Sequence, residues 1–346
     1  MTASIPWPFA QRIGGLVAGA HPLAGSYHIE QLASTLPAVV AAANEAVAEE
    51  TGLDLAGLPE VTVVSRREWV ERNISAFSSM LDPAERRLAE RIDRTGVDGA
   101  NLAHRVVAGQ TGALLGFLAR RVLGQYELVV PTGEQGDSIA FVGGNLLHME
   151  RAHQLNPREF RTWVALHESA HRAQFVGVGW MRGYFSGLVT EMVESAVPDE
   201  ARLSRLVEQI VHSRRTHTPM IDESGLLGLV AGPAQRAALD RIQALMSLLE
   251  GHGHVVMDRL GDRMLVSRPR MSSLLKARRS DPRTALFFKL TGLELKMRQY
   301  EEGERFVLAV EKQAGWQAIT LAWSEPQALP TLAEIKAPEQ WLKRVA

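Results

Sequence analysis

The sequence contains no cysteine among its 346 residues. This absence excludes disulfide bonds, thiolate metal sites and cysteine nucleophiles, so histidine and carboxylate side chains are the only strong metal ligands that the chain can offer. An excess of charge of either sign is also missing, because Lys and Arg number 38, Asp and Glu number 39, and the formal net charge is -1. A chain with so little net charge has no long-range field to attract nucleic acid, so we expect no nucleic-acid partner.

Long hydrophobic runs are absent as well. No stretch of about 18 apolar residues is free of charged residues, so we expect no segment that spans a membrane and no membrane partner. Residues 1–22 have no basic leader before their apolar stretch, and Pro6, Pro8 and Arg12 interrupt that stretch. We therefore interpret them as part of the mature protein and expect a cytoplasmic location.

Helical periodicity dominates the sequence and predicts a mainly α fold with a few short β-strands. The strand signals are confined to β-branched or apolar segments at 61–64, 126–130 and 139–142. We expect an N-terminal helical layer over residues 1–101 and a catalytic domain over residues 102–346. One continuous domain is the alternative, because a chain of this length can adopt either arrangement.

One predicted helix carries the chemistry. Its start is well specified, because Asn156 is a good N-cap, Pro157 suits the first helical position and Glu159 has capping-box spacing. His167 and His171 follow one turn apart, about 40° from each other around the helix axis, on its apolar side. The two imidazoles are therefore expected to face the interior together.

The sequence from His167 to His171 is HESAH, which fits the metal-binding pattern HExxH. Two neutral imidazoles one turn apart can take adjacent corners of a tetrahedral zinc site, with Glu168 beside them as the catalytic base. Water on a zinc ion held by three protein ligands becomes acidic. A nearby carboxylate can take the proton of this water and later deliver it to a leaving amine. The motif thus predicts a zinc-dependent hydrolase of peptides or small amides, most directly a metallopeptidase. A chance match on a buried helix is the competing interpretation, but two buried histidines without a partner are costly.

The third ligand must come from another segment. The extended motif HExxHxxGxxH is excluded, because Gln174 and Gly177 stand where its glycine and its third histidine belong. A glutamate is then the natural candidate, and we favour Glu250. Glu191 and Glu194 are the alternatives, since a helix-turn-helix could bring either of them back to the motif.

Glu250 is favoured because of its neighbours in the sequence. His254 and Asp258 follow it at i+4 and i+8, so the three side chains share one helix face. We expect these two residues, together with the nearby His252, to orient the metal ligands through hydrogen bonds. His252 suits this role least, since it lies about 200° from Glu250 around an ideal helix. An exposed polar helix face with no metal role is the competing interpretation.

Four segments together resemble one known family: VLGQYEL at 122–128, FRTWVALHESAHRAQF at 160–175, MSLLEGHGHVVMD at 246–258 and GLELKMRQYEEGERF at 292–306. On these segments the chain resembles the bacterial zincin-like metallopeptidases of the second type, which are often labelled as associated with deazaflavin-coenzyme biosynthesis. The resemblance covers most of the chain. It implies a zincin-like helical architecture around the HExxH helix, but the coenzyme label implies neither binding nor synthesis. His254 stands where relatives commonly carry an acid.

Tyr300 is a further candidate, because a tyrosine can donate a hydrogen bond to the oxyanion of a tetrahedral intermediate. A buried structural tyrosine is the simpler interpretation.

The strand pair within 126–142 could hold an extended peptide by strand addition, and ordinary packing is the alternative. Two rival functions stay open: a non-catalytic helical protein stabilised by zinc, and a metal-dependent hydrolase of a small amide.

Overall fold

The structure is a computed structural model, and it describes residues 5–95, 100–129, 135–195, 233–279 and 294–345. Within these ranges, side chains are left out of the description at residues 82–95, 100–103, 129, 135, 193–195, 233–234, 275–279 and 294–300. The fold is mainly α with one small sheet, as the sequence predicts. None of the described helices combines the length and the apolar character needed to cross a membrane.

The chain divides into two compact units. Unit 1 comprises residues 1–182 and 256–271, and unit 2 comprises residues 183–255 and 272–346. Unit 1 contains α1 (Trp7–Ala18), α2 (Tyr27–Thr51), β1 (Glu60–Val64), α3 (Arg66–Thr95), α4 (Ala100–Ala119), β2 (Gly124–Val129), β3 (Gln135–Val142), α5 (Gly143–Ala152) and α6 (Pro157–Val176). The expected boundary at residue 101 stays a prediction.

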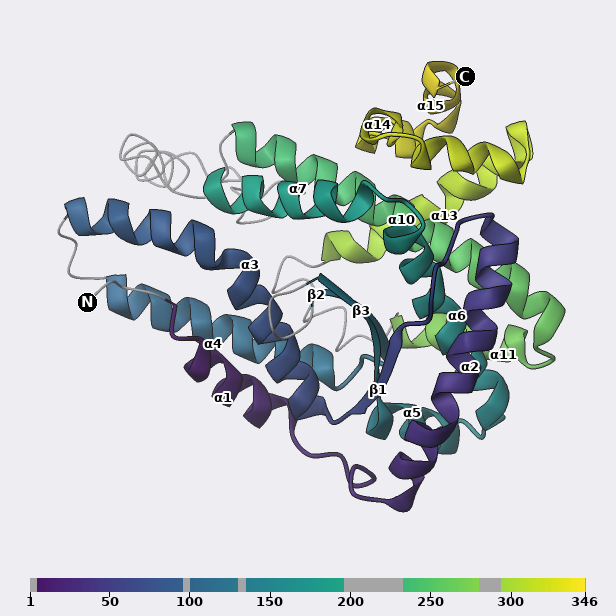
Figure 1. The fold of residues 1–346 in the computed structure, drawn as a ribbon, viewed down its shortest axis with the longest axis horizontal. Coiled ribbons are helices and arrows are strands. Elements are labelled where there is room, and N and C mark those ends of the chain that lie inside the picture. The colour runs from purple at the N-terminus through teal and green to yellow at the C-terminus, as the bar shows by residue number, and fades with distance from the viewer. Residues whose placement is uncertain (1–4, 96–99, 130–134, 196–232, 280–293, 346) are drawn as a thin grey trace, which may run out of the picture. The chain divides into compact units, whose positions relative to one another are not determined.

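The three strands form one sheet in the order β1-β3-β2 (Figure 1). β1 runs parallel to β3 and β2 runs antiparallel to it, so that Val61 and Tyr126 both pair with Ile139. The central strand is the most buried, and the four residues 139–142 are fully shielded from solvent. β2 therefore lies at an edge of the sheet formed by the described strands. The three predicted strand segments are confirmed, apart from residue 130, which lies outside the described residues.

Helices α1, α3 and α4 pack together in unit 1. The crossing of α1 and α4 is very close, because a Cβ added at Gly112 would lie 2.2 Å from the carbonyl oxygen of Ala10. A Cβ added at Gly116 would lie 2.4 Å from the carbonyl oxygen of Gly14. Only glycine allows the two backbones to approach this closely.

Helix α6 carries the HExxH motif and begins as the sequence predicts. The Asn156 side chain accepts hydrogen bonds from the main-chain N–H groups of Arg158 and Glu159, and Pro157 occupies the first helical turn. Along its length α6 packs against α2 and β2. The motif therefore lies on a helix that the rest of unit 1 covers.

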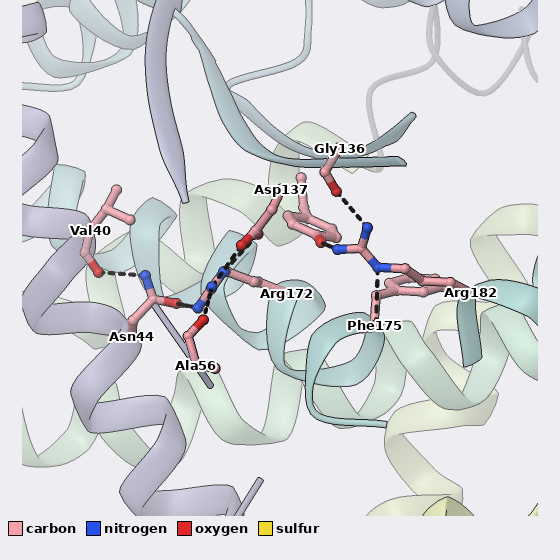
Figure 2. A network of polar contacts seen from close by, with 9 residues as sticks. Val40, Asn44, Ala56, Gly136, Asp137, Arg172, Phe175 and Arg182 are labelled. Carbon is pink, nitrogen blue, oxygen red and sulfur yellow. Dashed lines mark hydrogen bonds and ion pairs between the residues drawn. The ribbon is translucent and has the colours of Figure 1, made fainter. Parts of the chain in front are cut away.

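Two arginines, Arg172 within α6 and Arg182 just after it, join the last turns of α6 to other parts of unit 1 (Figure 2). The guanidinium of Arg172 is fully buried, donates to both carboxylate oxygens of Asp137 at 2.8 Å and also donates to the carbonyl oxygen of Ala56 at 2.9 Å. Arg182 donates to the carbonyl oxygens of Phe175 and Gly136 at 3.2 and 2.6 Å. These bonds reach the start of β3 and the loop after α2, and they fix the rotation of α6 about its axis.

Unit 2 holds most of α7 (Met181–Ser195) and of α10 (Pro233–Met264), and it also contains the later part of α11 (Arg268–Arg279). The remaining elements follow in order: α13 (Glu294–Ala314), η1 (Trp316–Trp323), η2 (Pro326–Ala328), α14 (Leu332–Lys336) and α15 (Pro338–Val345).

The helices α10 and α13 cross in close contact. A Cβ added at Gly303 would lie 1.8 Å from the carbonyl oxygen of Ser247, and one added at Gly251 would lie 2.1 Å from the carbonyl carbon of Gly303. No side chain fits between the two backbones. The crossing therefore fixes the part of α10 that carries Glu250.

Candidate metal centre

The two motif histidines point their ring nitrogens at each other. Nε2 of His167 lies 3.2 Å from Nε2 of His171, and the rings meet edge to face with centroids 4.6 Å apart. Zinc binds imidazole nitrogen at roughly 2.0–2.1 Å, so two nitrogens on one tetrahedral ion should stand about 3.3 Å apart. The separation of the two Nε2 atoms therefore suits two ligands of a single cation.

Glu250 completes a group that could hold a metal ion. His167, His171 and Glu250 each offer one ligand atom, and these atoms all lie within 4.8 Å of one another. Among the described residues, no other set of three or more His, Asp or Glu side chains meets this condition. Two imidazole nitrogens and one carboxylate oxygen form a donor set that zinc accepts, with a fourth position left for water or substrate.

The other candidates for the third ligand are placed differently. Glu191 forms an ion pair with Arg241, and both side chains are 44% exposed. Glu194 lies in α7, but its side chain is outside the described residues. Of the three glutamates that the sequence offers, Glu250 is the one that the structure groups with the histidines among the side chains described.

The Glu168 carboxylate is buried against the edge strand β2. Its Oε2 accepts a 2.9 Å hydrogen bond from the main-chain N–H of Tyr126. The strand approaches closely because residue 124 is a glycine, and a Cβ there would lie 2.9 Å from Cγ and 3.0 Å from Oε1 of Glu168. Sequence reasoning missed the roles of Gly124 and Tyr126. The segment 122–128 contributed to the family resemblance, but no spacing rule connects it with the motif.

The side chain of Tyr126 also has fixed contacts. Burial raises the pKa of its phenol, which stays neutral near pH 7 although Arg182 works in the opposite direction. The phenolic oxygen accepts a hydrogen bond from Arg182, and the ring stacks on Phe175 with centroids 6.2 Å apart. Tyr126 therefore connects the Arg182 contacts of Figure 2 with the carboxylate of Glu168.

A second hydrogen bond orients His171. Its Nδ1 lies 3.0 Å from the side-chain oxygen Oε1 of Gln174, and Gln174 is completely buried. Sequence reasoning used Gln174 only to exclude the extended motif. The spacing i, i+3 on one helix was the signal that could have revealed this contact.

The histidines that follow Glu250 have different surroundings. His252 is 1% exposed, stacks on Trp316 with centroids 5.7 Å apart and meets Trp323 edge to face at 5.2 Å. His254 is also buried. Hydrogen bonds from either residue to a metal ligand stay a prediction.

Two further candidates lie on other parts of the chain. Asp258 lies 3.7 Å from the guanidinium of Arg268. Tyr300 lies in α13, and its side chain falls outside the described residues. The roles assigned to Asp258 and Tyr300 therefore stay predictions.

The mainly α fold and the His–His–Glu group define a class of protein, namely helical proteins whose donor set fits that of metal-dependent hydrolases. The chain belongs to the family of zincin-like metallopeptidases, which it matches over residues 5–342. It is also similar to a crystal structure from Chloroflexus aurantiacus, described as a candidate hydrolase with a novel fold. The two chains are 31% identical, the similarity covers 98% of each chain, and the TM-score is 0.71. No curated protein matches the chain significantly.

The family membership confirms the resemblance stated from the sequence. Neither the family description nor the similar structure carries the deazaflavin-coenzyme label.

Proposed function

We propose that the protein is a zinc-dependent metallopeptidase, in which His167, His171 and Glu250 bind the zinc ion and Glu168 acts as the general base. The observation that carries this proposal is the convergence of two imidazoles and one carboxylate within 4.8 Å. Membership of the zincin-like metallopeptidase family supports the same reaction class. A bound zinc ion would supply Lewis acidity, acidifying water and polarising a carbonyl group.

Glu168 is suited to hold the proton that the reaction releases. It lies next to His167 in the sequence, and its hydrogen bond from the Tyr126 main chain keeps the carboxylate in one orientation. A carboxylate held in this way can accept a proton from a water molecule within hydrogen-bond reach. A base in a fixed position within reach of the attacking water accelerates the reaction most.

The edge strand β2 supports a peptide substrate over a small amide. Tyr126 directs its N–H away from β3 and toward Glu168, so residues two positions away direct their main-chain groups to the same side. An extended peptide can add to such an edge through main-chain hydrogen bonds. A peptide bound there would run past the carboxylate of Glu168.

Elemental analysis of protein purified without chelator and without affinity metal tests the proposal. We expect about one zinc per chain in the parent and a loss of zinc in His167→Ala and Glu250→Ala. Glu191→Ala is the matched control, because Glu191 is the rival carboxylate and pairs with Arg241 at the surface. A zinc content that falls in the Glu191 variant and not in the Glu250 variant would refute the ligand assignment.

The same preparation separates the proposal from a zinc-stabilised protein without activity. A metallopeptidase should cleave members of a broad peptide library and lose this activity with a chelator. A large chelator-induced loss of thermal stability, with no cleavage of any library member, would favour the non-catalytic alternative.

A further inference from the structure

Gln174 contacts one of the candidate metal ligands from the side away from the candidate ion site. Its side chain has no exposed surface, and its Oε1 lies 3.0 Å from Nδ1 of His171. The other nitrogen of that ring, Nε2, lies 3.2 Å from Nε2 of His167. His171 therefore has its two nitrogens in two different environments.

The orientation of the Gln174 amide decides which nitrogen of His171 carries the proton, and in this structure the amide oxygen faces Nδ1. An amide oxygen can only accept a hydrogen bond, so Nδ1 must be the donor. A neutral imidazole carries a single N–H, so Nε2 then has a lone pair directed toward His167. The opposite orientation of the amide would place the proton on Nε2 and remove the lone pair that a cation needs.

We propose that Gln174 is a positioning residue of the metal centre, which holds His171 in its Nδ1–H tautomer and directs Nε2 at the cation. This inference rests on the proposed function, because it concerns a ligand of the same site. Hydrogen-bond partners of metal-binding histidines orient the ring and raise its basicity. Gln174 would do both from a buried position one helical turn beyond the ligand.

The hydrogen-bond partner of His171 is an uncharged amide, and a carboxylate at position 174 provides a test of its role. A carboxylate is a stronger acceptor than an amide oxygen, so it would make the imidazole more basic and a better ligand. Gln174→Glu should therefore retain the orientation of His171 and bind zinc at least as tightly as the parent. Gln174→Leu keeps a similar volume but removes the acceptor.

Zinc affinity measured by competition with a chromophoric chelator tests the proposal on the full chain. We expect Gln174→Leu to bind Zn²⁺ about 10–100-fold more weakly than the parent, and Gln174→Glu to restore the affinity. Ser169→Ala is the matched control, because Ser169 is a fully buried polar residue of the same helix. Its affinity should equal that of the parent.

The outcomes separate this inference from the proposed function. Stoichiometric zinc in the parent with equal affinity in Gln174→Leu would overturn the role of Gln174 and leave the metal site standing. A parent that binds no zinc would overturn the metal site and the role of Gln174 with it. A Gln174→Glu variant weaker than the leucine variant would also contradict the role of Gln174.

A second measurement reads the tautomer in the parent protein itself. Nuclear magnetic resonance of the metal-free parent, with ¹⁵N-labelled histidine, reports the tautomer of each neutral imidazole. We expect the proton of His171 on Nδ1, and His171→Asn identifies its signal. A proton found on Nε2 would show that Gln174 donates to the ring, which overturns the proposal.

Discussion

The main-chain N–H of Tyr126 donates a 2.9 Å hydrogen bond to Oε2 of Glu168, and this bond joins the edge of the sheet to the HExxH helix. The two residues are 42 positions apart in the sequence. Strand β2 therefore orients the carboxylate of Glu168, the proposed base.

Gly124→Ala should slow turnover and leave the metal content unchanged. The added Cβ would lie 2.9 Å from Cγ of Glu168, so the carboxylate or the strand must shift. A misplacement of a catalytic group by about 1 Å can reduce the rate about a hundredfold. The measurement compares kcat on a peptide that the parent cleaves with zinc content. Gly179→Ala is the control, because a Cβ at Gly179 meets no atom within 4 Å. Equal rates for parent and Gly124→Ala would contradict the prediction.

Glu168→Gln should retain zinc and lose turnover. An amide has the shape of the carboxylate but cannot accept the proton of the attacking water, so the rate should fall by about 10²–10⁴-fold. Zinc content and peptide cleavage, measured on the same sample, check both halves of the prediction. A variant that still cleaves every substrate of the parent at an unchanged rate would remove Glu168 from the role of base.

Added zinc should raise the melting temperature of the metal-free parent. A ligand that binds only the folded state at 100 times its Kd stabilises that state by about 2.7 kcal/mol. His171→Ala should show little of this shift, because it removes one of the three donors. Differential scanning calorimetry with and without Zn²⁺ gives the comparison. An equal shift in parent and variant would mean that zinc binds elsewhere.

Arg172→Met should lower the free energy of unfolding by about 3 kcal/mol, near the low end for a broken buried ion pair. Arg172 is fully buried, whereas its partner Asp137 is 36% exposed, which moderates the loss. Arg241→Met is the control, since its pair with Glu191 is exposed and should contribute less than about 1 kcal/mol. Urea unfolding of the three proteins measures both effects. Equal losses in the two variants would contradict the structural role of Arg172.

The stability contributed by Glu334 should depend on pH. Hydrogen bonds from Arg344, aided by those from Thr331, hold the pKa of Glu334 below its ordinary value of 4.5. The folded state therefore binds the proton more weakly than the unfolded chain. The stability that Glu334 contributes to the folded state is complete above pH 4.5, and it is lost as the pH falls through the lowered pKa.

Melting temperatures of the parent and of Glu334→Gln between pH 3 and pH 7 check this dependence. The difference between the two proteins should be largest near pH 7 and should shrink as the pH falls. Glu339→Gln is the control, because Glu339 is an exposed residue of the neighbouring helix α15. A difference between the parent and Glu334→Gln that is constant with pH would contradict the assignment.

Features that depend on a few neighbouring residues could be predicted from the sequence. Asn156 caps α6 as expected, and His167 and His171 face each other because residues four apart lie on one side of any α-helix. The segments that form the sheet were also apparent, since alternating and β-branched runs favour strands. In each case the signal lies within a single segment of the chain.

Contacts between distant segments could not be predicted with the same certainty. Glu191, Glu194 and Glu250 were all open as partners of the histidines, and the structure groups Glu250 with them among the side chains described. The bond from Tyr126 to Glu168 and the ion pair of Arg172 with Asp137 had no signal in the sequence. Such pairs depend on how several helices and strands pack at once.

The sequence by itself determined the donor types, because a chain without cysteine leaves histidine and carboxylate, and the helical period places two histidines side by side. Only the tertiary structure decided which carboxylate joins them and which strand holds Glu168. The physical reason is that helix geometry follows from local backbone sterics, whereas the grouping of Glu250 with the histidines and the bond from Tyr126 to Glu168 join residues far apart in the chain.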